Sequence, residues 1–146
     1  MLELSSVAID PSLASKGVWA DYMGGKFLMA RHGHSYNQRL GELFNSNRDA
    51  VSKKDPDSGL LSIEAAAKLR EIHVQAFCET VLLDWKDVGE KGKALKFSTK
   101  TAMKILMDPR YQELTDFLEG FSRNHYHYRD VSNQEVADGV KTTAVS

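Results

Sequence analysis

Apolar and aromatic residues near the start of the chain form two short runs that flank a pair of glycines. The first run spans residues 17–23 and the second spans residues 26–31, with Gly24 and Gly25 between them. Both glycines can adopt the positive φ that a type I′ turn requires, so this pattern predicts a β-hairpin. A lone hairpin is marginally stable in water, and its apolar face is therefore expected to pack on a helix or on another copy of the chain.

Behind the hairpin, the spacing of apolar residues becomes helical. Tyr36, Leu40 and Leu43 recur at intervals of three and four residues, which predicts a short amphipathic helix. Asparagine, aspartate, serine, proline and glycine then crowd residues 45–59, and this composition is typical of a loop or linker.

Three further helices are predicted from capping residues and apolar periodicity. Ser62 is a suitable N-cap for the first helix, whose apolar positions continue to Leu83. Ser98 can cap a second, shorter helix. Asp108 can cap the third, with Pro109 at its first position. The third helix has apolar residues at the i, i+3, i+4 and i+7 positions, namely Leu114, Phe117, Leu118 and Phe121.

These elements predict an α+β fold that is mainly α-helical, with a small N-terminal β-hairpin packed against a bundle of about four helices. Residues 1–16 are expected to be a flexible lead-in, residues 17–130 the folded domain, and residues 131–146 a flexible tail. The domain could consist of two lobes, 17–45 and 60–130, joined by the loop 46–59.

Composition narrows the classes of function. With 146 residues, of which 42% are hydrophobic, the chain can bury a core of its own. The 19 basic and 20 acidic residues give a net charge of -1, without the basic excess that phosphate binding favours, so no nucleic-acid partner is expected. No apolar run approaches the length of a membrane span and no secretion signal is apparent, which predicts a cytoplasmic protein without a membrane partner. The single cysteine, Cys78, is expected to be a small buried hydrophobe.

One tripeptide suggests an enzyme. Arg31-His32-Gly33 follows an apolar strand and resembles the opening motif of the histidine phosphatase superfamily, whose histidine is phosphorylated. That chemistry also needs a phosphate pocket and a second histidine far downstream, and the alternating strand–helix order of an α/β phosphatase is missing. The favoured interpretation is that the tripeptide ends the hairpin. No catalytic residue is predicted, and a histidine-phosphatase-like enzyme is kept as a remote alternative.

Histidine spacing also raises the question of a metal site. His32 and His34 would point the same way on a strand, whereas His125 and His127 would diverge by roughly 200° on a helix. The sequence contains no cysteine pair and no HExxH motif. Neither a metal ion nor a cofactor is therefore predicted.

Several short sequence motifs, taken in their order along the chain, resemble those of a known protein family. Residues 81–88, VLLDWKDV, are followed by Gly92-Lys93, by Phe97-Ser98 and by residues 102–108, AMKILMD. The front of the chain adds Gly17-x-Trp19, the hairpin and its Ala30-Arg31 ending. Taken together over roughly residues 17–124, the chain resembles the tail assembly chaperones of lambda-like long-tailed bacteriophages (siphophages). In that family a helix ends in a motif of the type Leu-x-Trp-Lys-x-Val. A glycine-containing loop, a capped short helix and a final helix follow it.

The resemblance implies a protein that binds the tape measure protein, keeps it soluble and promotes recruitment of tail tube subunits during tail morphogenesis. Such a chaperone works in the host cytoplasm and is not expected in the mature virion. Many members also have a longer form made by ribosomal frameshifting, for which residues 136–146 would be the place, and self-association is possible. The family has no catalytic residues to transfer. The alternative from a neighbouring class is a structural tail completion or head–tail joining protein of the virion.

A protein that holds a client should expose an apolar patch with a polar rim. The tape measure protein of this family is largely helical, which suggests contacts between helices. For each candidate contact residue the alternative is ordinary core packing. The candidates are aromatic and apolar side chains of the hairpin, of the motif at residues 81–88 and of the aromatic segment 121–128: Trp19, Tyr22, Met23, Trp85, Phe121, Tyr126 and Tyr128.

Overall fold

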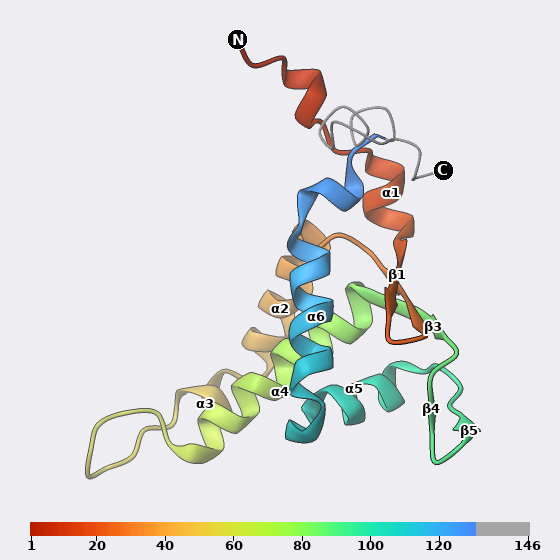
Figure 1. Ribbon diagram of the computed structural model, residues 1–146. Coiled ribbons are helices and arrows are strands. Elements are labelled where there is room, and N and C mark those ends of the chain that lie inside the picture. Colours follow the sequence, from red (N-terminus) through yellow and green to blue (C-terminus); the bar gives the residue numbers. More distant parts are fainter. Residues whose placement is uncertain (131–146) are drawn as a thin grey trace.

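The longest helix, α4, lies at the centre of the molecule, and α2, α3, α5 and strand β3 all pack against it (Figure 1). The computed structural model describes residues 1–130. Its helices are η1 Leu4–Val7, α1 Pro11–Lys16, α2 His34–Ser46, α3 Arg48–Ser52, α4 Ile63–Thr80, α5 Thr99–Met107, η2 Pro109–Tyr111, α6 Gln112–Arg123 and η3 His125–Tyr128. Its strands are β1 Val18–Tyr22, β2 Gly25–Met29, β3 Leu82–Lys86, β4 Gly89–Glu90 and β5 Lys93–Ala94. The predicted α+β, mainly α-helical fold is confirmed.

The predicted hairpin is formed by β1 and β2, which pair in antiparallel fashion. Its turn lies one residue earlier than expected, because Tyr22 pairs with Gly25 and the loop consists of Met23 and Gly24. Both loop residues have positive φ, 47° at Met23 and 92° at Gly24. Gly25 is a buried strand residue, and a Cβ there would lie 3.3 Å from the ring of Phe27. The second glycine therefore lies outside the turn, at a strand position where a Cβ would pack tightly against Phe27.

The predicted helix from Ser62 to Leu83 is wrong at its C-terminal end. The Ser62 hydroxyl accepts a hydrogen bond from the Ala65 amide at 3.1 Å, as expected of the cap, but α4 ends at Thr80. The following residues form β3, which adds to β2 as the third strand of an antiparallel sheet ordered β1-β2-β3. A short apolar run suits a strand as well as a helix, and pairing with β2 decides the matter here.

Two segments expected to lack regular structure contain short helices. Within residues 1–16, the Asp10 carboxylate caps α1 with Pro11 at its first position. The Asp10 amide donates to the Tyr128 carbonyl at 2.8 Å, which joins the start of the domain to its end. Within the predicted loop 46–59, Arg48–Ser52 forms α3 because Val51 is buried against the core. The predicted tail 131–146, with the suggested frameshift position, lies outside the described residues.

Of the last two predicted helices, the first begins at its predicted cap and the second begins three residues later than predicted. The Ser98 hydroxyl accepts from the Thr101 amide at 3.0 Å and begins α5. Asp108 accepts from the Arg110 amide at 3.0 Å, but the first turn after Pro109 is the 3-10 helix η2, so α6 begins at Gln112.

One cluster of buried side chains holds these elements together, and it takes residues from both sides of segment 46–59. It contains the inner face of the sheet and the packed faces of α2, α4, α5 and α6, including Phe27, Tyr36, Ile72, Trp85 and Leu118. Cys78 is buried within it, as predicted, and burial raises the pKa of its thiol to about 12. Within residues 1–130, no helix combines the length and apolar character needed to cross a bilayer.

Candidate functional site

Two of the seven candidate contact residues lie in the interior. Trp85 is buried on β3, where its indole Nε1 donates to the Leu95 carbonyl at 2.8 Å and its ring meets Phe97 edge-on. Tyr128 is fully buried, and its hydroxyl lies 3.1 Å from both the Met29 and the Ala30 carbonyl oxygens. Both side chains hold the fold together, which was the alternative stated for each of them.

The hairpin candidates are more accessible. Met23 is 88% exposed at the turn, and Trp19 is 37% exposed on the outer face of the sheet, with the Lys86 ammonium 4.5 Å from its ring centroid. Tyr22 is partly buried on the opposite face, where its hydroxyl donates to Glu113 and its ring lies 4.7 Å from that of Phe117. The hairpin therefore presents Trp19 and Met23 to solvent.

The remaining candidates lie near the junction of α6 and η3. Phe121 and Tyr126 are both partly buried. The Phe121 ring stacks on His127 with 3.9 Å between ring centroids. The seven residues thus divide among the core, the hairpin and this junction, and they do not form one surface.

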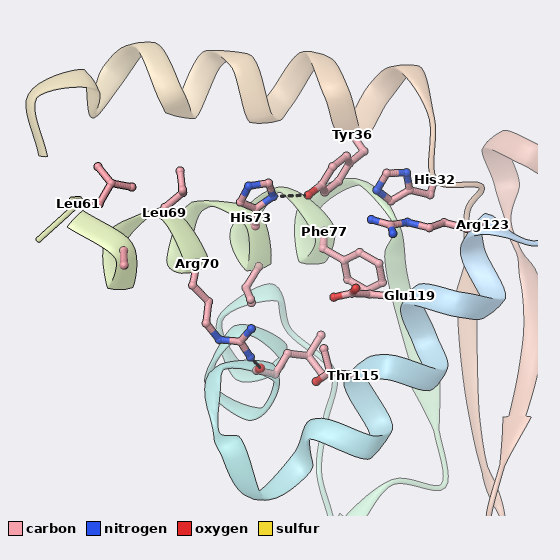
Figure 2. Close-up of a pocket in the computed structure, with 13 residues that line it drawn as sticks. His32, Tyr36, Leu61, Leu69, Arg70, His73, Phe77, Thr115, Glu119 and Arg123 are labelled. Carbon is pink, nitrogen blue, oxygen red and sulfur yellow. Dashed lines mark hydrogen bonds between the residues drawn. The ribbon is translucent and has the colours of Figure 1, made fainter. Parts of the chain in front are cut away.

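A groove along α4 is the clearest concave site in residues 1–130, and sequence reasoning did not identify it. It has a volume of about 400 Å³ and lies between α2, α4, α5 and α6 (Figure 2). We call it the α4 groove. Its lining residues are His32, Tyr36, Leu61, Ala66, Leu69, Arg70, His73, Val74, Phe77, Leu106, Thr115, Glu119 and Arg123.

One end of the α4 groove is apolar. Leu61 and Leu69 lie there in Figure 2, and Ala66 and Leu106 also line the groove. Beside Leu61 in sequence, Leu60 and Ile63 are 70% and 84% exposed. Unpartnered apolar surface therefore continues from the groove to the segment between α3 and α4, which projects away from the sheet in Figure 1.

The other end carries polar groups from three parts of the chain. The ring of His32, which precedes α2, lies 4.1 Å from the ring of Tyr36. The Tyr36 hydroxyl lies 2.8 Å from His73 Nδ1 on α4. Glu119 and Arg123 reach into this end from α6 (Figure 2).

Burial and charge alter the protonation equilibria at this end. Burial lowers the pKa of His32, and the positive charge of Arg123 lowers it further. Burial raises the pKa of Tyr36, with a further contribution from the Glu119 carboxylate. His32 Nε2 is buried and has no hydrogen-bond partner among the described residues. The α4 groove therefore has a neutral imidazole with an unsatisfied nitrogen beside a cationic guanidinium.

Between the two ends, Arg70 connects α4 to the neighbouring helices. Its Nη2 donates to the Leu106 carbonyl at 3.1 Å and lies 3.5 Å from Gln112 Oε1. These contacts join α4 to the C-terminal end of α5 and to the start of α6.

The sequence contained part of the signal for this site. Thr115, Glu119 and Arg123 recur every four residues and share one face of α6, beside its apolar stripe. The sequence linked His32 to the phosphatase motif and to a possible metal pair with His34, and it placed His73 only in mid-helix. Their meeting around Tyr36 depends on how α2 packs on α4, which no local spacing reveals.

The chemistry of the α4 groove fits binding through apolar and polar contacts. The sheet beside His32 is antiparallel and three-stranded, unlike the α/β sheet that the histidine phosphatase resemblance implies. Within residues 1–130, no three or more His, Cys, Asp or Glu side chains gather in a way that could hold a metal ion.

Comparison with known proteins identifies one matching family model. A family model described as YdaY prophage protein matches residues 34–138, which include α2 to η3 and nearly all residues that line the α4 groove. No curated protein and no solved structure matches the chain. The family indicates a phage-derived protein.

Proposed function

The chain belongs to the YdaY prophage protein family, and from this premise we propose that it is a tail assembly chaperone of the prophage that encodes it. In this proposal the chain binds the tape measure protein, keeps it soluble and promotes the recruitment of tail tube subunits. It acts by binding and not by catalysis, in the host cytoplasm, and is absent from the mature virion. Self-association and a longer frameshifted form belong to the same proposal.

The observation that carries the proposal is the α4 groove with its apolar extension. A holding protein needs accessible apolar surface with polar groups around it, and a groove between helices suits a helical client. The groove provides Leu61 and Leu69 for apolar contact, and Leu60 and Ile63 extend that surface. Its arginines and Glu119 supply the polar rim.

The proposal is tested by co-expression with the tape measure protein encoded in the same prophage. We expect the tape measure protein to become soluble and to co-purify with the chain. If it stays insoluble and the chain is instead found in purified particles by mass spectrometry, the chaperone proposal fails. The chain would then be a structural tail completion or head–tail joining protein.

Two neighbouring alanines on α4 provide a matched pair of variants. Ala66 lines the groove, whereas the exposed Ala67 does not. Ala66→Glu places a charge in the apolar end of the groove and should reduce the yield of soluble complex severalfold. Ala67→Glu adds the same charge on an exposed part of the helix and should leave the yield unchanged. Equal yields from the two variants would show that the client binds elsewhere.

A further inference from the structure

We propose that the α4 groove receives a helix of the client whose apolar side chains fill the Leu61–Leu69 end and whose acidic side chain pairs with Arg123 at the other end. This inference rests on the proposed function and specifies the chemistry of the partner. It follows from the length of the groove, the distribution of its charges and the unsatisfied nitrogen of His32.

The length of the groove suits a short helical segment. Its floor runs along α4 from Ala66 to Phe77, a span of about 16 Å at the rise of an α-helix. That is about three turns of a partner helix, which presents side chains on one face at i, i+3 or i+4, and i+7. The apolar and polar ends of the groove would then face the two ends of one such stripe.

Arg123 lies at the polar end, and among residues 1–130 no carboxylate forms an ion pair with it, although Glu119 lies one turn earlier on the same helix. The positive charge of Arg123 acts on His32 and Tyr36 and lowers the pKa of both side chains. It therefore favours the neutral imidazole and the ionised phenol. A guanidinium forms its strongest hydrogen bonds with a carboxylate, which it can bind in bidentate fashion.

The balance of charge favours an acidic partner over a basic one. The charged residues that line the groove are Arg70, Arg123 and Glu119, because burial and Arg123 keep His32 neutral. Arg70 already donates a hydrogen bond to the Leu106 carbonyl. This bond occupies one donor of the Arg70 guanidinium and leaves its positive charge unchanged. A carboxylate seated on Arg123 would bring the groove close to neutrality.

His32 provides an independent indication that the polar end is incomplete when empty. Its Nε2 is buried without a partner, and a buried polar atom that loses its bond to water is costly unless another group replaces it. This nitrogen is inaccessible in the empty groove, so a client group beside Arg123 reaches it only if the His32 ring turns toward the groove. The polar end therefore contains an unsatisfied nitrogen next to the position proposed for the client carboxylate.

The experiment uses the full chain and overlapping 20-residue peptides that cover the tape measure protein of the same prophage, with binding followed by fluorescence anisotropy. We expect the binding peptides to share an acidic residue and an apolar stripe at helical spacing. Arg123→Glu should weaken their binding at least tenfold, and replacement of the acidic peptide residue by Lys should restore most of the loss. Arg123→Gln should give an intermediate loss, and circular dichroism should show that both variants remain folded.

Lys100→Glu is the matched control. Lys100 is exposed on α5 and does not line the groove, so the same change of charge there should alter binding less than twofold. If the chain solubilises the tape measure protein but no peptide binds, or binding is insensitive to Arg123→Glu, this inference is overturned while the chaperone proposal stands. If no complex forms with the parent chain, the chaperone proposal itself fails.

Discussion

His32 shows how a single side chain at the α4 groove depends on its surroundings. Its ring packs on Tyr36, and its Nε2 is buried without a partner among the described residues. The neighbouring Arg123 adds positive charge to a site where burial already disfavours the imidazolium. The fold therefore binds a proton at His32 less readily than the unfolded chain does.

This difference predicts the direction of a pH effect on stability. Because the pKa of His32 in the fold lies below its ordinary value of 6.5, the unfolded chain binds more protons as the pH falls through 6.5. The contribution of His32 to the free energy of unfolding is fully present above the pKa that His32 has in the unfolded chain. It is lost as the pH falls toward the lower pKa that His32 has in the folded protein. Urea unfolding at about pH 7.5 and about pH 5.5 should show a lower free energy of unfolding at the acidic pH.

Substitution separates His32 from the other histidines in that measurement. His32→Gln should reduce the dependence on pH, and the partly buried His127, whose pKa is also lowered by burial, should account for part of what remains. His34→Gln changes an exposed side chain and serves as the control. An unchanged dependence on pH in His32→Gln would contradict this description of the groove.

At the scale of elements, local signals were reliable where a capping residue preceded an apolar stripe. Ser62, Ser98 and Asp108 each accept the amide hydrogen bond expected of a cap. Asp10-Pro11 carries the same signal as Asp108-Pro109, but no long apolar stripe follows it, and α1 was missed. Strand β3 could not be distinguished from the end of a helix, because its hydrogen bonds with β2 are tertiary.

The hairpin turn leads to a prediction about stability. Met23 holds a φ of 47° at the first loop position, a conformation that costs most L-residues about 1 kcal/mol or more and that Asn tolerates better. Met23→Asn creates the Asn-Gly sequence preferred in type I′ turns and should raise the free energy of unfolding by about 0.5–1 kcal/mol.

Urea denaturation measures this gain, and Met23→Ala provides the control. Alanine removes the same exposed side chain without a preference for positive φ, so it should give no gain. If Met23→Asn is no more stable than the parent, the turn is not under the strain that its dihedral angles indicate. Because Met23 was also a candidate contact residue, the effect of Met23→Asn on client binding shows whether the hairpin contributes.

On the scale of the whole molecule, α4 contributes to both the core and the groove. Ile72, Ala76 and Cys78 are buried in the core, Ala66 and His73 line the groove, and Phe77 does both. The mainly helical fold could be predicted from the sequence because its stripes and caps are local. The groove could not, because it exists only where α2, α5 and α6 pack around α4.

The central claim is that this chain holds the tape measure protein in a soluble state. The most direct measurement is light scattering as the denatured tape measure protein is diluted into buffer with increasing amounts of the purified chain. The proposal predicts that scattering falls as the chain is added and that a soluble complex of the two proteins elutes from a gel-filtration column. Aggregation that proceeds unchanged at every excess of the chain would contradict it.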